Sequence, residues 1–169
     1  MSRDFETIDF DFGLGSPSLN TPPDHFSVTW RGRVRPEFTE TYTFLTTSDD
    51  GVRLWVDDRL VVDHWTVHSA TEDSGILDLE AGHWYDLRLE YYENTGSASA
   101  VLSWSSPSQA KQVIPQARLS ATSGSDDRGS ILQETWTGIT GSEIAALTSN
   151  ANYPSKPSGR EYLLNFESI

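Results

Sequence analysis

The feature that most constrains this chain is a series of short segments in which apolar and polar residues alternate. Residues 8–12, 41–45 and 52–56 each place every second side chain on one face. This period of two residues is typical of a β-strand with one buried face. Gly, Pro, Asn and Asp separate such segments, and no long segment has the period of a helix. The sequence therefore predicts an all-β fold.

Charge and length restrict the partners that we expect. The chain has 169 residues, enough for one domain with a sizeable core. Its formal net charge is −13, and such a surface repels phosphate backbones and anionic lipids. We therefore expect neither nucleic acid binding nor membrane insertion. Because the chain has no cysteine, disulfides and thiolate metal sites are excluded. No signal peptide is recognised, and the chain is interpreted as a piece of a larger protein.

The composition changes at Ser120, which suggests a division of the chain. We expect a β-sandwich over residues 1–120, a polar linker over 121–130 and a further segment over 131–169. The last segment alone has too few residues to bury a core. Within the sandwich, strands are expected at residues 26–30, 76–79, 84–93, 100–104 and 112–119, and connecting segments at 31–39 and 63–74.

Asp49, Asp50 and Gly51 join two of the alternating segments, so we expect them at the exposed tip of a hairpin. Asp and Gly are common turn residues, and a simple turn is one interpretation. The other interpretation is a calcium site, because two adjacent carboxylates offer hard oxygen ligands to a cation. The residues alone leave both interpretations open.

Three other groups of residues are weaker candidates. Asp57 and Asp58 are expected to form a tight hairpin turn, because Asp tolerates positive φ. His64 and His68 are four residues apart, but no helix surrounds them and no zinc site is expected. Trp65 is interpreted as a cover over the core edge, with a sugar-stacking platform as the alternative.

Several motifs follow one another in an order that resembles a known family. They occupy residues 8–13, 26–32, 42–44, 48–57 and 89–94, and include Ser48-Asp49-Asp50-Gly51 and Tyr91-Tyr92-Glu93-Asn94. Together they resemble the PA-fourteen (PA14) domain, the module named after the bacterial toxin protective antigen, over about residues 5–119. The resemblance implies a β-sandwich of two antiparallel sheets with long loops at one end. It also implies an extracellular or cell-surface location.

The resemblance also implies a binding site. In the lectin branch of the family, an Asp-Asp pair joined by a cis peptide binds calcium, and this pair maps onto Asp49 and Asp50. A second loop maps onto residues 94–99 and adds an Asn side chain, here Asn94, with backbone carbonyls. Ca²⁺ is therefore the expected cofactor, and sugar hydroxyls would complete its coordination shell. The expected carbohydrate-binding residues are Asp49, Asp50, Asn94, Gly96, Ser97 and Trp65.

These expectations support one leading hypothesis and two others. The leading hypothesis is a non-enzymatic, calcium-dependent, lectin-like module of a larger extracellular adhesin or hydrolase, with glycans as partners. The alternative is a structural or protein-binding sandwich of a surface protein, in which calcium only rigidifies loops. A glycosidase is disfavoured because the sequence places no pair of carboxylates across a cleft.

Residues 131–136 resemble the first strand of the same family, and no such strand precedes residues 8–12. Residues 131–169 are therefore interpreted as the opening of a following repeat. An unpaired sheet edge invites pairing. We expect residues 132–136 to fill the vacant position, within the chain or in another copy, which gives a monomer or a strand-swapped dimer. Trp136 should then be buried.

Overall fold

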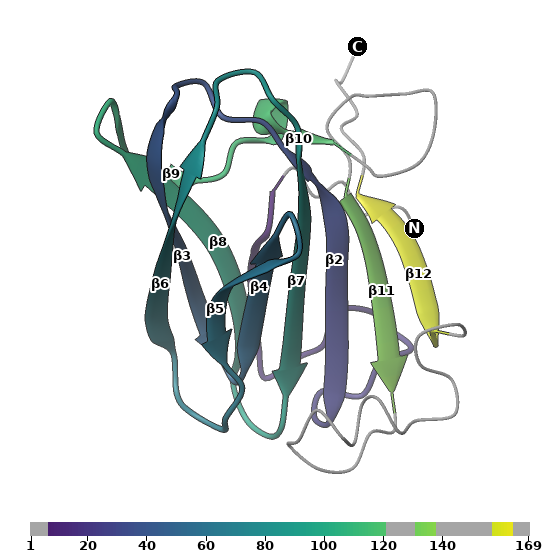
Figure 1. Cartoon of the computed structure of the whole chain (residues 1–169). Coiled ribbons are helices and arrows are strands. Elements are labelled where there is room, and N and C mark those ends of the chain that lie inside the picture. The colour runs from purple at the N-terminus through teal and green to yellow at the C-terminus, as the bar shows by residue number, and fades with distance from the viewer. Residues whose placement is uncertain (1–6, 121–130, 138–156, 164–169) are drawn as a thin grey trace.

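Two antiparallel sheets pack face to face in the computed structural model, which describes residues 7–120, 131–137 and 157–163 (Figure 1). The five-stranded sheet has the order β1-β8-β3-β6, with β9 paired to β8. The seven-stranded sheet has the order β12-β11-β2-β7-β4-β5, with β10 paired to β2. The predicted all-β sandwich is confirmed. No helix in these residues is long and apolar enough to cross a membrane.

The strands of the first sheet are β1 (Asp9–Gly13), β3 (Glu40–Asp49), β6 (Thr71–Leu79), β8 (Ala98–Ser106) and β9 (Gln109–Val113). Those of the second are β2 (Phe26–Val34), β4 (Val52–Val56), β5 (Arg59–His64), β7 (Tyr85–Glu93), β10 (Leu119–Ser120), β11 (Ile131–Thr137) and β12 (Gly159–Leu163). A 3-10 turn, η1 (Gln116–Arg118), precedes β10.

Aromatic side chains from both sheets fill the core between them. Phe10 stacks on Trp30 across the sandwich, with ring centroids 5.5 Å apart. Tyr42 packs against Trp104 at 4.9 Å. Both tryptophans are fully buried, and burying side chains of this size is the main stabilising contribution to such a fold.

Several strands are longer or more divided than the sequence predicts. The expected turn over residues 31–39 is wrong at its start, because alternating burial continues through Gly32 and β2 ends at Val34. The expected loop over residues 63–74 shrinks to residues 65–70, since β5 and β6 extend into it from either side. The expected strand over residues 112–119 is divided among β9, η1 and β10.

The connection from β3 to β4 is not a hairpin, so that prediction is wrong. The two strands belong to different sheets, and Asp50 and Gly51 carry the chain from one sheet to the other. Alternation shows which face of a strand is buried but does not show to which sheet the strand belongs. The tight turn at Asp57 and Asp58 is confirmed, with φ of 47° and 60° between the paired strands β4 and β5.

The edge strands of the two sheets approach closely at Gly75. A Cβ built on Gly75 of β6 would lie 2.0 Å from the backbone oxygen of Val61 in β5. Real Cβ atoms do not come this close, so a glycine is required for the contact. This contact closes the sandwich on the side where β6 and β5 form its edges.

Strand β11 lies beside β2 in the seven-stranded sheet (Figure 1). Trp136 pairs with Ser27, and Thr135 pairs with Val28. Trp136 is buried, with 1% of its surface exposed. The expected linker over residues 121–130, and residues 138–156 and 164–169 of the expected repeat segment, lie outside the described residues.

Candidate functional site

The candidate site lies where the chain crosses from β3 to β4, and the peptide bond between Asp49 and Asp50 is cis. The expected exposed tip is wrong for Asp50, which is only 2% exposed. Its Oδ1 accepts a hydrogen bond of 2.9 Å from the backbone N–H of His68. Its Oδ2 accepts one of 2.9 Å from the backbone N–H of Asn94. The Asp50 carboxylate therefore ties the β5–β6 and β7–β8 loops to this end of the sandwich.

Glu93, at the end of β7, adds a third carboxylate. Oxygen atoms of Asp49, Asp50 and Glu93 all lie within 4.8 Å of one another. Glu93 is 1% exposed. Its Oε2 lies 3.1 Å from the Tyr91 hydroxyl, which also contacts the backbone oxygen of Asp49. Its Oε1 is buried and has no hydrogen-bond partner among the described residues. An uncompensated buried carboxylate oxygen is costly, and a bound cation would compensate it.

Burial, together with the mutual repulsion of these carboxylates, changes the pKa values of the site. Burial, followed by the charge of Asp50, raises the pKa of Glu93 to about 7. Burial, again followed by Asp50, raises the pKa of Asp49. Burial and the same negative charges raise the pKa of Tyr92 to about 12. Burial and mutual repulsion thus make the ionised carboxylates of this site unfavourable. A bound cation would stabilise their ionised forms.

The residues present fit a hard divalent cation. Three carboxylates converge, and calcium prefers six to eight oxygen ligands. Each Asp50 oxygen already accepts one backbone hydrogen bond but keeps a second lone pair for an ion. In the described part of the chain, these three residues are the one group of three or more His, Cys, Asp or Glu side chains that could hold a metal.

The second predicted loop lies beside the acidic group. Asn94 donates its backbone N–H to Asp50 and accepts a bond of 3.0 Å from the N–H of His25 through its own carbonyl. Gly96 has φ of 109° and donates to Oδ1 of Asp24 at 3.1 Å. Gly96 and Ser97 are exposed. The structure therefore brings this loop to the site, while the Asn94 side chain as a ligand, and Gly96 and Ser97 as sugar contacts, stay predictions.

Trp65 lies in the β5–β6 loop and packs against Tyr92. Their ring centroids are 4.8 Å apart, and the guanidinium of Arg53 lies 5.4 Å from the Trp65 ring. The half-buried indole thus covers Tyr92. The packing favours Trp65 as a cover, and its role in sugar binding stays a prediction.

His64 and His68 lie in the same region with their rings stacked at 4.0 Å. Nδ1 of His64 pairs with Asp73 at 2.7 Å, and Nδ1 of His68 lies 2.9 Å from the backbone oxygen of Ser69. Both contacts hold the rings against the β5–β6 loop. The described contacts therefore give the histidines a role in holding this loop.

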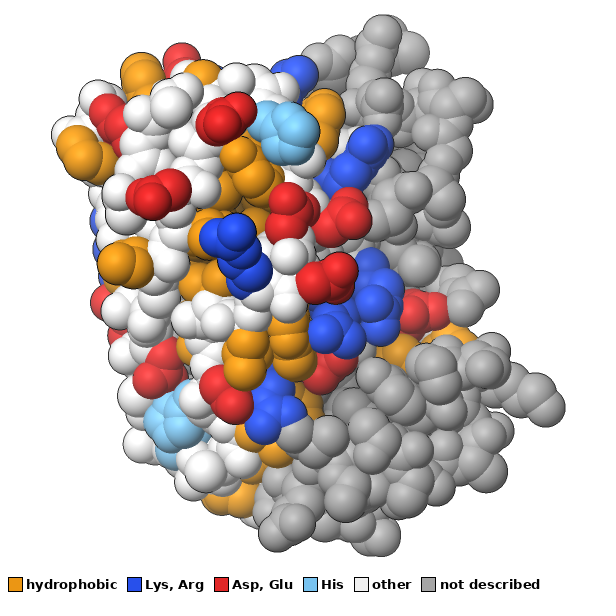
Figure 2. All heavy atoms as spheres, viewed as in Figure 1, with side chains coloured by type: hydrophobic (Ala, Val, Ile, Leu, Met, Phe, Trp, Pro, Cys, Tyr) orange, Lys and Arg blue, Asp and Glu red, His pale blue; other side chains and the backbone are white. Residues whose placement is uncertain are grey.

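The outer face of the seven-stranded sheet, seen in Figure 2, mixes basic and acidic side chains. The Arg88 guanidinium lies 3.9 Å from the centre of the Trp55 ring and 3.3 Å from Glu90. Arg31 pairs with Glu134 of β11 at 3.7 Å. Because these arginines already contact carboxylates, we do not assign an anion site to this face.

Glu93 is the site residue that the sequence interpretation missed. The alternation in β7 assigns Tyr85, Leu87, Leu89 and Tyr91 to one face. Extending the same period by one step places Glu93 on that face, toward the core, where a carboxylate is unusual. The sequence therefore contains a signal for Glu93, although the expected metal ligands are Asp49, Asp50 and Asn94 alone.

Comparison with known proteins gives a family and a set of relatives. The sequence matches the PA14 domain family over residues 3–118. It is 51% identical over 117 residues to the anti-sigma-I factor RsgI3 of Acetivibrio thermocellus, covering 69% of this chain and 18% of that protein. A solved anti-sigma factor domain-containing protein is 49% identical with a TM-score of 0.70, covering 74% of this chain and 44% of that chain.

A solved PA14 sugar-binding domain from an RTX adhesin is 20% identical with a TM-score of 0.51. The match covers 63% of this chain and 71% of the solved chain. At this identity, the match shows the shared fold alone. The much higher identity to anti-sigma factors overturns the prediction of a calcium-dependent lectin module of an adhesin or hydrolase. Motifs shared by a whole family identify the fold but not the branch. By its match over residues 3–118, the chain belongs to the PA14 domain family.

Proposed function

We propose that this domain is the sensory part of a longer protein of the anti-sigma factor type, and that it recognises a polysaccharide at the loop end around Asp49, Asp50 and Glu93. The observation that carries the sensory role is the 51% identity to part of an anti-sigma-I factor. The chain spans less than a fifth of that relative, which leaves room for separate signalling parts in such a protein.

The loop end supports the choice of ligand. Backbone groups of two loops converge on Asp50, and the exposed Gly96 and Ser97 border it. Sugar hydroxyls are hard oxygen donors that bind to carboxylates and to cations. A PA14 domain with the same fold is described as sugar-binding, which agrees with this choice.

The proposal includes a divalent cation, with calcium as the ion that suits the ligands. Asp49, Asp50 and Glu93 would hold the ion. Its positive charge would compensate the buried Oε1 of Glu93, which has no hydrogen-bond partner among the described residues. The ion would stabilise the loop end whether or not a saccharide is present.

In this proposal, the domain binds the polysaccharide without hydrolysing it. The domain lies outside the cytoplasmic membrane, where large polysaccharides occur. A domain that only binds leaves its ligand unchanged. Incubation with polysaccharides, followed by measurement of reducing ends, should show no increase over a blank. A calcium-dependent or calcium-independent increase would contradict this part of the proposal.

Affinity electrophoresis tests the proposal directly. The protein is run through native gels containing cellulose derivatives, xylan, mannan or pectin, and we expect at least one polysaccharide to retard it. Asp49→Asn should reduce the retardation. Asp9→Asn is the matched control, because Asp9 is exposed on β1, outside the site. Equal retardation of both variants, or retardation by no polysaccharide, would contradict the proposal.

A further inference from the structure

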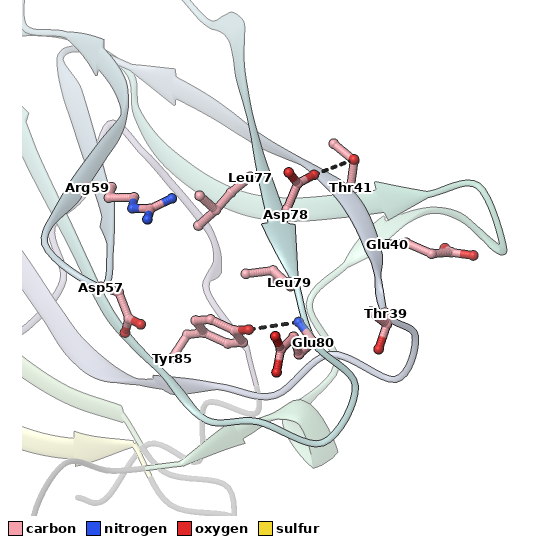
Figure 3. A pocket seen from close by; sticks show the side chains of 10 residues that line it. All are labelled: Thr39, Glu40, Thr41, Asp57, Arg59, Leu77, Asp78, Leu79, Glu80 and Tyr85. Carbon is pink, nitrogen blue, oxygen red and sulfur yellow. Dashed lines mark hydrogen bonds between the residues drawn. The ribbon is translucent and has the colours of Figure 1, made fainter.

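A cavity opens between the edges of the two sheets, away from the acidic site (Figure 3). Its volume is about 710 Å³, within the range of about 300–1,000 Å³ that is common for ligand pockets. Its walls come from the start of β3, the end of β6, the β4–β5 turn and the start of β7. The contact between Gly75 and Val61 lies two residues before Leu77, which lines the cavity. We call this cavity the edge pocket.

The edge pocket lies at the end of the sandwich opposite the acidic site. Strand β3 begins at Glu40, which lines the pocket, and ends at Asp49, which belongs to the acidic group. At about 3.3 Å per residue, the ten residues of β3 separate the two sites by roughly 30 Å. The two sites therefore share no residue.

The pocket combines an apolar wall with uncommitted polar groups. Leu77, Leu79 and the Tyr85 ring form the wall, and Figure 3 shows the Arg59 side chain extending toward Leu77. Within the described part of the chain, the side chains of Arg59 and Glu80 form no hydrogen bond or ion pair. The Tyr85 hydroxyl accepts a bond of 2.7 Å from the N–H of Glu80, so its own proton is available to donate.

Other carboxylates of the pocket are already fixed in position. Asp78 accepts a hydrogen bond of 2.5 Å from the Thr41 hydroxyl. Asp57 accepts one of 2.7 Å from the backbone N–H of Asp86. Glu40 accepts one of 3.0 Å from the N–H of Ser108. Such bonds pre-organise acceptors and lower the entropic cost of binding a ligand.

The charges of the lining restrict the ligand. The lining includes four carboxylates (Glu40, Asp57, Asp78 and Glu80) but one guanidinium (Arg59), so anionic ligands such as phosphates and uronic acids are repelled. A neutral sugar matches the mixture of groups: its hydroxyls donate to carboxylates and accept from Arg59 and Tyr85. The apolar face of a pyranose ring suits Leu77 and the Tyr85 ring.

We propose that the edge pocket is a second saccharide site, specific for neutral pyranose units. It is separate from the loop end and takes its own ligand contacts. A polysaccharide that reached both sites would bind more tightly than to either alone, because the second contact becomes intramolecular.

Nuclear magnetic resonance with the full chain tests the proposal. Cellohexaose, xylohexaose and mannohexaose are the neutral probes, with hexagalacturonate as the anionic probe and tetralysine as the cationic probe. We expect at least one neutral hexaose to shift the amide signals of Leu77, Leu79 and Glu80. Hexagalacturonate and tetralysine should leave these signals in place.

Two variants test the assigned contacts. Arg59→Gln and Glu80→Gln should each weaken binding at these signals about tenfold, as expected for losing one hydrogen bond to a charged group. Lys111→Gln is the matched control: it removes one positive charge from β9, outside the pocket. Thermal unfolding of each variant checks that its fold is intact.

Several results would overturn the proposal. They are no shift at the pocket signals with any neutral hexaose, shifts with tetralysine or hexagalacturonate only, and equal effects of Arg59→Gln and Lys111→Gln. The loop-end proposal is read from the signals of Gly51 and Gly96 in the same spectra. Failure at one end is therefore distinguishable from failure at the other.

Discussion

Gly51 lies directly against the ring of Tyr92: a Cβ built on Gly51 would stand 2.2 Å from Cε1 of Tyr92. Tyr92 in turn packs against Trp65. The absence of a side chain at residue 51 thus lets the crossing segment and the aromatic cover meet. The glycine that follows the acidic pair is required by packing, because its Cβ would occupy the position of the ring.

Gly51→Ala should therefore destabilise the protein. The added methyl must displace the Tyr92 ring, and overpacking of this kind costs about 1–3 kcal/mol. Urea unfolding of both proteins measures the difference. In a Tyr92→Ala background the same substitution should cost much less, because the ring is gone. An equal cost in both backgrounds would show that the ring is not the cause.

Calcium should raise the stability of the parent protein. A ligand at 100 times its Kd adds about 2.7 kcal/mol to the free energy of unfolding. Glu93→Gln and Asp49→Asn should each lose most of this gain, and a chelator should reverse it in the parent. Asp9→Asn, outside the site, should keep the full gain. If calorimetry measured the same calcium affinity for Glu93→Gln and for the parent, Glu93 would not be a calcium ligand.

In the presence of a chelator, stability should fall as the pH rises from about 4.5 toward 7. Burial and Asp50 raise the pKa of Glu93 to about 7, against an ordinary value of 4.5. Within this interval the folded protein holds a proton that the unfolded chain has released, so a higher pH favours unfolding. Glu93→Gln cannot ionise and should flatten the slope. Parallel curves of unfolding free energy against pH for the two proteins would contradict this.

Strand β11 should contribute substantially to stability. Trp136 is 1% exposed beside β2, and replacing a buried tryptophan by alanine costs about 3–5 kcal/mol. Trp136→Ala should therefore lower the melting temperature strongly, Trp136→Phe less, and truncation after Ser120 at least as much as Trp136→Ala. If the truncated chain kept the melting temperature and solubility of the parent, β11 would not be needed to complete the sheet.

Local sequence patterns predict most strands of this fold, because alternation in β1, β3 and β4 reports directly which side chains are buried. They do not predict the crossing at Asp50, since β3 and β4 would alternate identically in a hairpin. The burial of Asp50 depends on backbone groups of His68 and Asn94, which are distant in the sequence.

The two candidate sites differ in how far the sequence predicts them. The Asp49–Asp50 pair is adjacent in the chain and stands out, and the phase of β7 adds Glu93. The edge pocket brings Arg59, Leu77 and Tyr85 together from three strands, and none of them belongs to a motif. Such a site becomes visible only when the register of the strands is known.

We propose above all that the loop end around Asp49, Asp50 and Glu93 recognises a saccharide. The most direct measurement is the set of amide shifts of the full chain on titration with oligosaccharide fragments of the polysaccharide that retards it in gels. We predict shifts at Gly51, Asn94 and Gly96, which Asp49→Asn weakens and Asp9→Asn leaves unchanged. Unchanged signals at these three residues under saturating oligosaccharide would contradict the claim.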